Sequence, residues 1–194
     1  GISTIVVGVD GDSPFPLADF KQKIDSNPAA VNIASFTGHG SIRTRVMGAD
    51  FKREASAQEV ERMQALLASD MQNGSLGLAS GLEYDPGIYS RTQEVIALAR
   101  TAAAMNGRYA SHMRSEDRNF HEAVEELILI GKEAEIPVHI SHMKLAALNL
   151  WGQARQVLQR LDAARASGID VSADVYPYTY WQSTLTVLLP ERDF

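Results

Sequence analysis

The sequence contains no cysteine, so it can form neither a disulfide bond nor a thiolate ligand for a metal ion. It has no apolar run of 18 or more residues, which is the pattern of a membrane-spanning helix. No basic segment followed by an apolar core opens the chain, so we expect no signal peptide. We expect no membrane partner, and since the absence of cysteine does not fix the compartment, we take the cytoplasm as the default location. Any metal ion in it must be held by histidine and carboxylate side chains.

Basic residues are fewer than acidic ones, at 18 Lys and Arg against 24 Asp and Glu, and the net charge is −6. Affinity for nucleic acid comes mainly from clustered Lys and Arg, so we expect no nucleic-acid partner. The chain has 194 residues, 45% of them hydrophobic, which is enough to bury a core without disulfides or a structural metal. These values describe an ordinary globular domain and leave its function open.

Short apolar runs rich in β-branched residues recur along the chain and predict buried strands. They lie at 5–8, 31–36, 76–79, 109–111, 138–141 and 171–174. Helical patterns separate most of them, and two of these patterns open with a capping-box signature, Ser56 with Glu59 and Ser90 with Gln93. Alternating strands and helices predict a parallel α/β sheet.

Apolar stripes at helical spacing mark two further helices. Their members are Phe120, Val124, Leu127 and Ile130 in one, and Trp151, Ala154, Val157, Leu158 and Leu161 in the other. Three helices are expected to end at a left-handed glycine, namely Gly74, Gly107 and Gly168.

The spacing of the strands favours a (β/α)₈ TIM-like barrel, whose units are about 30 residues long. A doubly wound sheet is the rival fold, but the first turn lacks the glycine fingerprint that binds phosphate there. A complete barrel has eight strands and six are found. The chain opens at Gly1 inside an apolar run and without an initiator methionine. We therefore expect residues 1–194 to form a partial barrel domain of about six βα units, with its first and last strands missing.

Nearly every predicted strand is followed at once by a polar or ionisable residue. In chain order these are Asp10, His39, Glu83 with Tyr84, His112 with Arg114 and Glu116, His142 with Lys144, and Asp174 with Tyr176. The reacting groups of barrel enzymes lie at the carboxyl ends of the strands. These residues are therefore candidates for one shared site.

His112 and His142 form the sharpest pair among them. Each ends an apolar segment as Ser-His-Met, and they lie 30 residues apart, about one βα unit. On neighbouring strands they would face one mouth as a site for a divalent metal, and zinc suits histidine with a carboxylate. The alternative is two unrelated histidines held by hydrogen bonds. Asp10, in a Gly-Val-Asp-Gly turn, fits either a third metal ligand or a turn aspartate.

The other histidines have simpler interpretations. We expect His121 to be exposed on a helix and His139 to be a packing histidine inside a strand. His39 lies in a glycine-rich turn and fits either a pocket or a structural role. Four further side chains are candidates for binding an anionic substrate, with surface charges or packing aromatics as the alternative: Tyr84, Arg114, Lys144 and Tyr176.

Several long motifs resemble those of the D-aminoacylases, the N-acyl-D-amino-acid deacylases of the amidohydrolase superfamily. They are GLEYDPGIYS at 81–90, SHMRSE at 111–116, ISHMK at 140–144, DVYPYT at 174–179, and the GHG, Arg and VMG element at 38–48. The likeness runs in order over nearly the whole chain.

This resemblance implies a TIM-like barrel, usually joined to a small β domain, with zinc at the barrel mouth. It implies His112 and His142 as zinc ligands. It places Lys144, Tyr176 and Ser183 near the substrate carboxylate, and Tyr84 in the pocket for the acyl group or side chain.

The sequence departs from the family pattern in three places. The HxH pair of the family's first strand is absent, and Asp10 stands where many members have a metal-binding cysteine. A carboxylate can replace that thiolate, which supports Asp10 as a ligand. The family's catalytic aspartate comes from a late strand that we expect beyond residue 194, and Asp174 belongs to an earlier motif.

The sequence hypothesis is therefore zinc-dependent hydrolysis of a small N-acyl-D-amino acid to a carboxylate and a D-amino acid. Two alternatives remain open. One is a different amidohydrolase reaction, such as dihydroorotase-like or hydantoinase-like hydrolysis of a cyclic amide, because a fold does not choose a substrate. The other is a catalytically silent fragment or binding homologue.

Overall fold

The computed structural model describes residues 1–188 as parallel strands alternating with helices. The strands are β1 (Thr4–Val7), β2 (Asn32–Ser35), β3 (Thr37–Gly38), β4 (Gly77–Gly81), β5 (Arg108–His112), β6 (Val138–Ile140) and β7 (Val171–Ala173). The helices are α1 (Leu17–Ser26), α2 (His39–Met47), α3 (Ala57–Gln72), α4 (Thr92–Ala103), α5 (Phe120–Ala134) and α6 (Ala154–Ala166). Short 3₁₀ turns occur at Gly87–Tyr89, Leu148–Leu150 and Leu185–Leu188.

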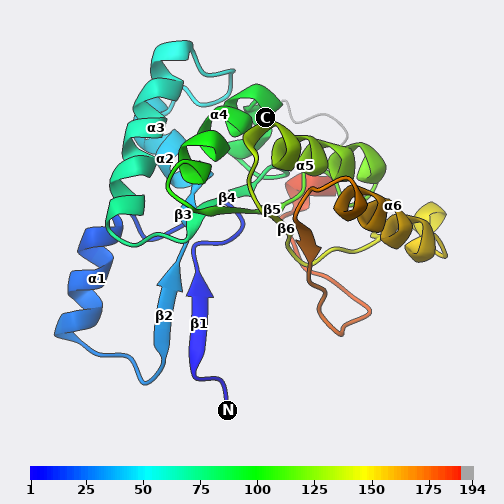
Figure 1. The fold of residues 1–194 in the computed structure, drawn as a ribbon, viewed down its shortest axis with the longest axis horizontal. Coiled ribbons are helices and arrows are strands. Elements are labelled where there is room, and N and C mark those ends of the chain that lie inside the picture. Colours follow the sequence, from blue (N-terminus) through cyan, green and yellow to red (C-terminus); the bar gives the residue numbers. More distant parts are fainter. Residues whose placement is uncertain (189–194) are drawn as a thin grey trace.

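All strand pairs are parallel and follow one another in chain order. β1 pairs with β2, and a second sheet has the order β3-β4-β5-β6-β7. Figure 1 shows β1 and β2 side by side below this second sheet. A hydrogen bond from the Leu76 amide to the Ser35 carbonyl joins the end of β2 to the start of β4. The sequence prediction of a parallel α/β fold is confirmed, and each predicted strand lies within about two residues of an observed one.

The main core lies between the helices and one face of the second sheet. Neighbouring helices pack on one another in chain order, from α2 to α5. Leu78 and Tyr109 are paired across β4 and β5 and are buried in this core. Their neighbours Ala79 and Ala110 point to the opposite face, because side chains alternate along a strand, and they form a small separate cluster with Phe36.

Three local predictions are wrong. Ser90 does not cap α4: its hydroxyl donates to the Gly87 carbonyl, and α4 starts after Arg91 without a side-chain cap. Trp151 and Leu158 were predicted to belong to the apolar stripe of the helix at 151–161, but both are exposed, so the buried face of α6 is narrower than expected. After α4 the left-handed residue is Asn106 and not Gly107. Among residues 1–188, no helix combines the length and apolar character of a membrane span.

Candidate metal centre

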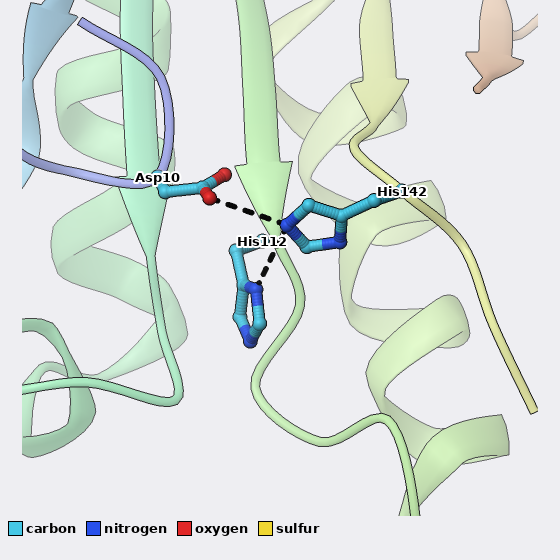
Figure 2. Close-up of side chains that lie close together, drawn as sticks. All are labelled: Asp10, His112 and His142. Atoms are coloured by element: carbon cyan, nitrogen blue, oxygen red, sulfur yellow. Dashed lines mark hydrogen bonds and ion pairs between the residues drawn. The ribbon is translucent and has the colours of Figure 1, made fainter. Parts of the chain in front are cut away.

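Asp10, His112 and His142 come from three separate strand ends and meet at one point (Figure 2). Asp10 lies in the turn after β1, His112 is the last residue of β5, and His142 follows β6. Both Asp10 and His142 have positive φ angles, 59° and 38°, which non-glycine residues adopt rarely. Such backbone conformations persist when surrounding contacts hold them, as the hydrogen bond from the His142 amide to Asp174 Oδ1 at 2.5 Å does here.

The three side chains offer one ligand atom each within 4.8 Å of one another. His142 Nε2 lies 3.1 Å from His112 Nδ1 and 3.2 Å from Asp10 Oδ2. The second carboxylate oxygen of Asp10, Oδ1, is buried and has no hydrogen-bond partner among the described residues. A buried oxygen without a partner is costly unless a cation satisfies it. One carboxylate and two imidazoles are also a donor set that zinc accepts, so these residues fit a metal ion.

Two buried glutamates contact the far nitrogens of the same histidines. Glu83 Oε2 lies 2.8 Å from His112 Nε2, and Glu116 Oε1 lies 3.1 Å from His142 Nδ1. Both glutamates were among the residues after strand ends that the sequence offered for one shared site, but neither was predicted to be a metal ligand, a partner of a ligand or a substrate contact. The signal was available, because Glu83 follows β4 by two residues and Glu116 follows His112 by four.

The charges of this cluster shift several pKa values. Burial works to lower the pKa of His142, but hydrogen bonds to Asp10 and Glu116 outweigh it and raise that pKa to about 9. Burial works to raise the pKa of Asp10, yet the hydrogen bond and charge of His142 hold it below its ordinary value. Burial raises the pKa of Tyr84 to about 12, so its hydroxyl stays protonated at neutral pH.

A cavity of about 280 Å³ opens beside these residues. Four of the five predicted substrate-binding side chains line it: Tyr84, Lys144, Tyr176 and Ser183. The Lys144 ammonium forms an ion pair with Glu116 and lies 5.3 Å from the centre of the Tyr176 ring. Arg114 is the exception, because its guanidinium makes two hydrogen bonds of 2.8 Å with Glu126 and does not line the cavity.

Comparison with known proteins identifies the chain's relatives, although no family model matches it. It is 35% identical to D-aminoacylase of Alcaligenes xylosoxydans xylosoxydans over 92% of the chain, and 32% identical to N-acyl-D-glutamate deacylase of the same organism over 99%. The chain is homologous to the D-aminoacylases. It spans 41% and 39% of the lengths of these two proteins.

Solved structures related to D-aminoacylase agree with this assignment. N-acyl-D-glutamate deacylase of Bordetella bronchiseptica, complexed with zinc and a phosphonate mimic of the reaction's tetrahedral intermediate, aligns with a TM-score of 0.86 and 31% identity over 92% of the chain and 42% of that protein. L-hydantoinase of Arthrobacter aurescens shares the fold alone, with a TM-score of 0.56 and 15% identity over 91% of the chain and 40% of that protein.

The other three histidines lie outside the cluster of Asp10, His112 and His142. His39 is fully buried, with Nε2 2.7 Å from Glu94. His121 is exposed on α5, as predicted. His139 is hydrogen-bonded to Ser172 and Asp174, so its polar atoms are satisfied as expected, but its side chain is 35% exposed and is not packed in the core.

Proposed function

We propose that the protein hydrolyses the amide bond of an N-acyl-D-amino acid, releasing a carboxylate and a D-amino acid, with zinc as its cofactor. The observation that carries this proposal is the meeting of Asp10, His112 and His142 beside a cavity lined by Lys144. The relatives supply the substrate class, since they are named for D-amino acids with an N-acyl group. The D stereochemistry rests on these relatives and not on a contact in the site.

We further propose that the strands belong to a (β/α)₈ barrel and that residues 1–194 are one part of it. Parallel strands in chain order, without the reversal of a doubly wound sheet, support this arrangement. Site residues at the carboxyl ends of β5 and β6 are also where a barrel enzyme carries its chemistry.

The proposed ligands of zinc are Asp10, His112 and His142. The chemistry that zinc supplies when bound is polarisation of the amide carbonyl and a lower pKa for water. Lys144 would bind the substrate carboxylate through its ammonium group and so hold the amide in one orientation. The Tyr84 hydroxyl, which is protonated at neutral pH, would donate a hydrogen bond to an oxygen of the substrate. The resemblance to the D-aminoacylases assigns the proton transfer to an aspartate of a later strand.

A substrate panel tests the proposal. The full-length protein, purified and loaded with zinc, would be assayed with N-acyl-D-amino acids, their L enantiomers and cyclic amides such as hydantoins. Hydrolysis of the D compounds in preference to the others is the expected result. Preference for a cyclic amide would favour the hydantoinase-like alternative, which the shared fold of L-hydantoinase keeps open. No hydrolysis of any member would favour a silent homologue.

A further inference from the structure

The two ring nitrogens of His112 have different surroundings. Nε2 lies 2.8 Å from the carboxylate of Glu83, whereas Nδ1 faces His142 Nε2 at 3.1 Å and the Tyr84 hydroxyl at 3.0 Å. A neutral imidazole carries one hydrogen, and a carboxylate oxygen accepts a hydrogen bond. The contact with Glu83 therefore places that hydrogen on Nε2, and Nδ1 presents its lone pair on the side of His142 and the Tyr84 hydroxyl.

We infer that Glu83 is a positioning residue that fixes the tautomer and ring orientation of His112, so that Nδ1 is the nitrogen that binds the metal. The inference rests on the metal-dependent function proposed above. A ligand histidine whose far nitrogen donates to a carboxylate is both oriented and made more basic. Glu83 is suited to this task because it is only 7% exposed, so little water competes for the hydrogen bond.

The backbone around Glu83 is tied to the backbone of His112. Gly81 is the partner of His112 in the β4–β5 register, and the Leu82 amide donates to the His112 carbonyl at 3.1 Å. Tyr84 lies on the other side of Glu83, and its ring centroid is 4.3 Å from that of His112. One short segment therefore contacts both edges of the imidazole, and a change in the Glu83 side chain leaves these other contacts in place.

Variants of Glu83 test the inference through zinc affinity, with a matched control in the same chain. Glu83→Gln keeps the size and one acceptor oxygen but removes the charge, and Glu83→Leu removes the acceptor. The control is Glu94→Gln, since Glu94 is also a buried glutamate, 2.7 Å from the Nε2 of the buried His39 and outside the metal cluster. Zinc affinity of the purified proteins would be measured by competition with a chromophoric chelator.

We expect the zinc Kd to rise about 10-fold in Glu83→Gln and about 100-fold in Glu83→Leu, the range found when a ligand's carboxylate partner is lost. The Glu94→Gln variant should lose thermal stability and keep the zinc Kd of the unsubstituted protein. In ¹⁵N spectra of the histidine rings, His112 should be the Nε2–H tautomer in the unsubstituted protein and lose this preference in Glu83→Leu. If Glu83→Leu does not fold, Glu83→Gln alone decides the affinity test.

Three results would overturn the inference in distinguishable ways. Tight zinc binding that is unchanged in the Glu83 variants would overturn the role of Glu83 and leave the proposed function standing. A second equivalent of zinc that disappears in Glu83→Gln would make Glu83 a ligand itself. A protein that binds no zinc at all would overturn the proposed function together with the inference.

Discussion

The ammonium group of Lys144 contacts both the proposed metal site and the proposed substrate cavity. Lys144 is paired with Glu116 and lies 3.0 Å from His142 Nδ1, so it contacts the surroundings of the proposed metal as well as the cavity. The substrate carboxylate would have to share this ammonium group with Glu116. Lys144 is therefore the residue at which binding of substrate and binding of metal are most easily separated by experiment.

Replacing Lys144 by methionine should weaken substrate binding and leave zinc in place. A hydrogen bond to a charged group contributes about 1.5–3 kcal/mol, so we expect KM for an N-acyl amino acid to rise by about 10- to 100-fold. The matching amide, whose carboxylate is blocked, should show little change. Steady-state kinetics and metal analysis of Lys144→Met, beside the exposed control Lys132→Met, check this. Loss of zinc with an unchanged KM would assign Lys144 to the metal site instead.

Asp70 offers a test of electrostatics away from the site. Burial raises its pKa, although the Leu17 amide and the Thr37 hydroxyl donate hydrogen bonds that oppose the shift. The folded state therefore binds this proton at higher pH than the unfolded state does, so stability is gained as the pH falls through the raised pKa. Urea unfolding at pH 7 and near pH 4, close to the ordinary pKa of 3.8, should show the unsubstituted protein gaining free energy of unfolding relative to Asp70→Asn at the lower pH. A difference that does not change with pH contradicts the raised pKa.

At the scale of single elements, α3 is the clearest case of local sequence determining structure. Ser56 Oγ accepts from the Glu59 amide at 3.3 Å, and the Glu59 carboxylate accepts from the Ser56 amide at 2.8 Å, which completes the predicted capping box. The same signature at Ser90 fails, because that hydroxyl is used by the Gly87 carbonyl in the preceding turn. Ser56 caps its helix and Ser90 does not because Ser90 is bound by the turn before the helix. A four-residue motif cannot reveal that contact.

Ser56→Ala should therefore lower the free energy of unfolding by about 1 kcal/mol, the usual cost of losing an N-cap. Ser90→Ala should not show the loss of an N-cap, since Ser90 does not cap α4. Urea denaturation of both variants measures the two effects. Amide hydrogen exchange would measure fraying at the first turn of α3 in Ser56→Ala and of α4 in Ser90→Ala. Equal fraying of the two helices would contradict this assignment.

The strands and their terminal polar residues could be predicted because they depend on neighbours in the sequence. A buried apolar run followed by a histidine identified β5 and β6 and brought His112 and His142 to one place. The positions of Glu83 and Arg114 just after their strands were visible in the sequence, but the partner of each side chain could not be predicted, because it depends on how the loop after the strand turns back. Glu83 turns toward His112, whereas Arg114 turns toward Glu126 on α5.

At the scale of the whole molecule, the proposed metal joins segments that are far apart in the chain. Asp10 and His142 are separated by 132 positions, and β1 pairs with β2 in a sheet of its own. A metal held by both residues would tie this small sheet to β5 and β6. A ligand that binds only the folded arrangement stabilises it.

Removing zinc with a chelator should therefore loosen β1 and β2 more than the larger sheet. We expect faster amide hydrogen exchange in Thr4–Val7 and Asn32–Ser35, with little change in β4 and β5. Exchange measured by mass spectrometry before and after chelation checks this. Unchanged exchange in all of these strands would contradict a link through the metal.

The most direct test of the account is the metal content of the purified protein beside a His112→Ala, His142→Ala double variant. Mass spectrometric metal analysis should find about one zinc or more per chain in the unsubstituted protein and loss of that zinc in the variant, because two of the three proposed ligands are gone. An unsubstituted protein that carries no metal and takes up none would contradict the metal centre. The two histidines would then be packing residues of the sheet.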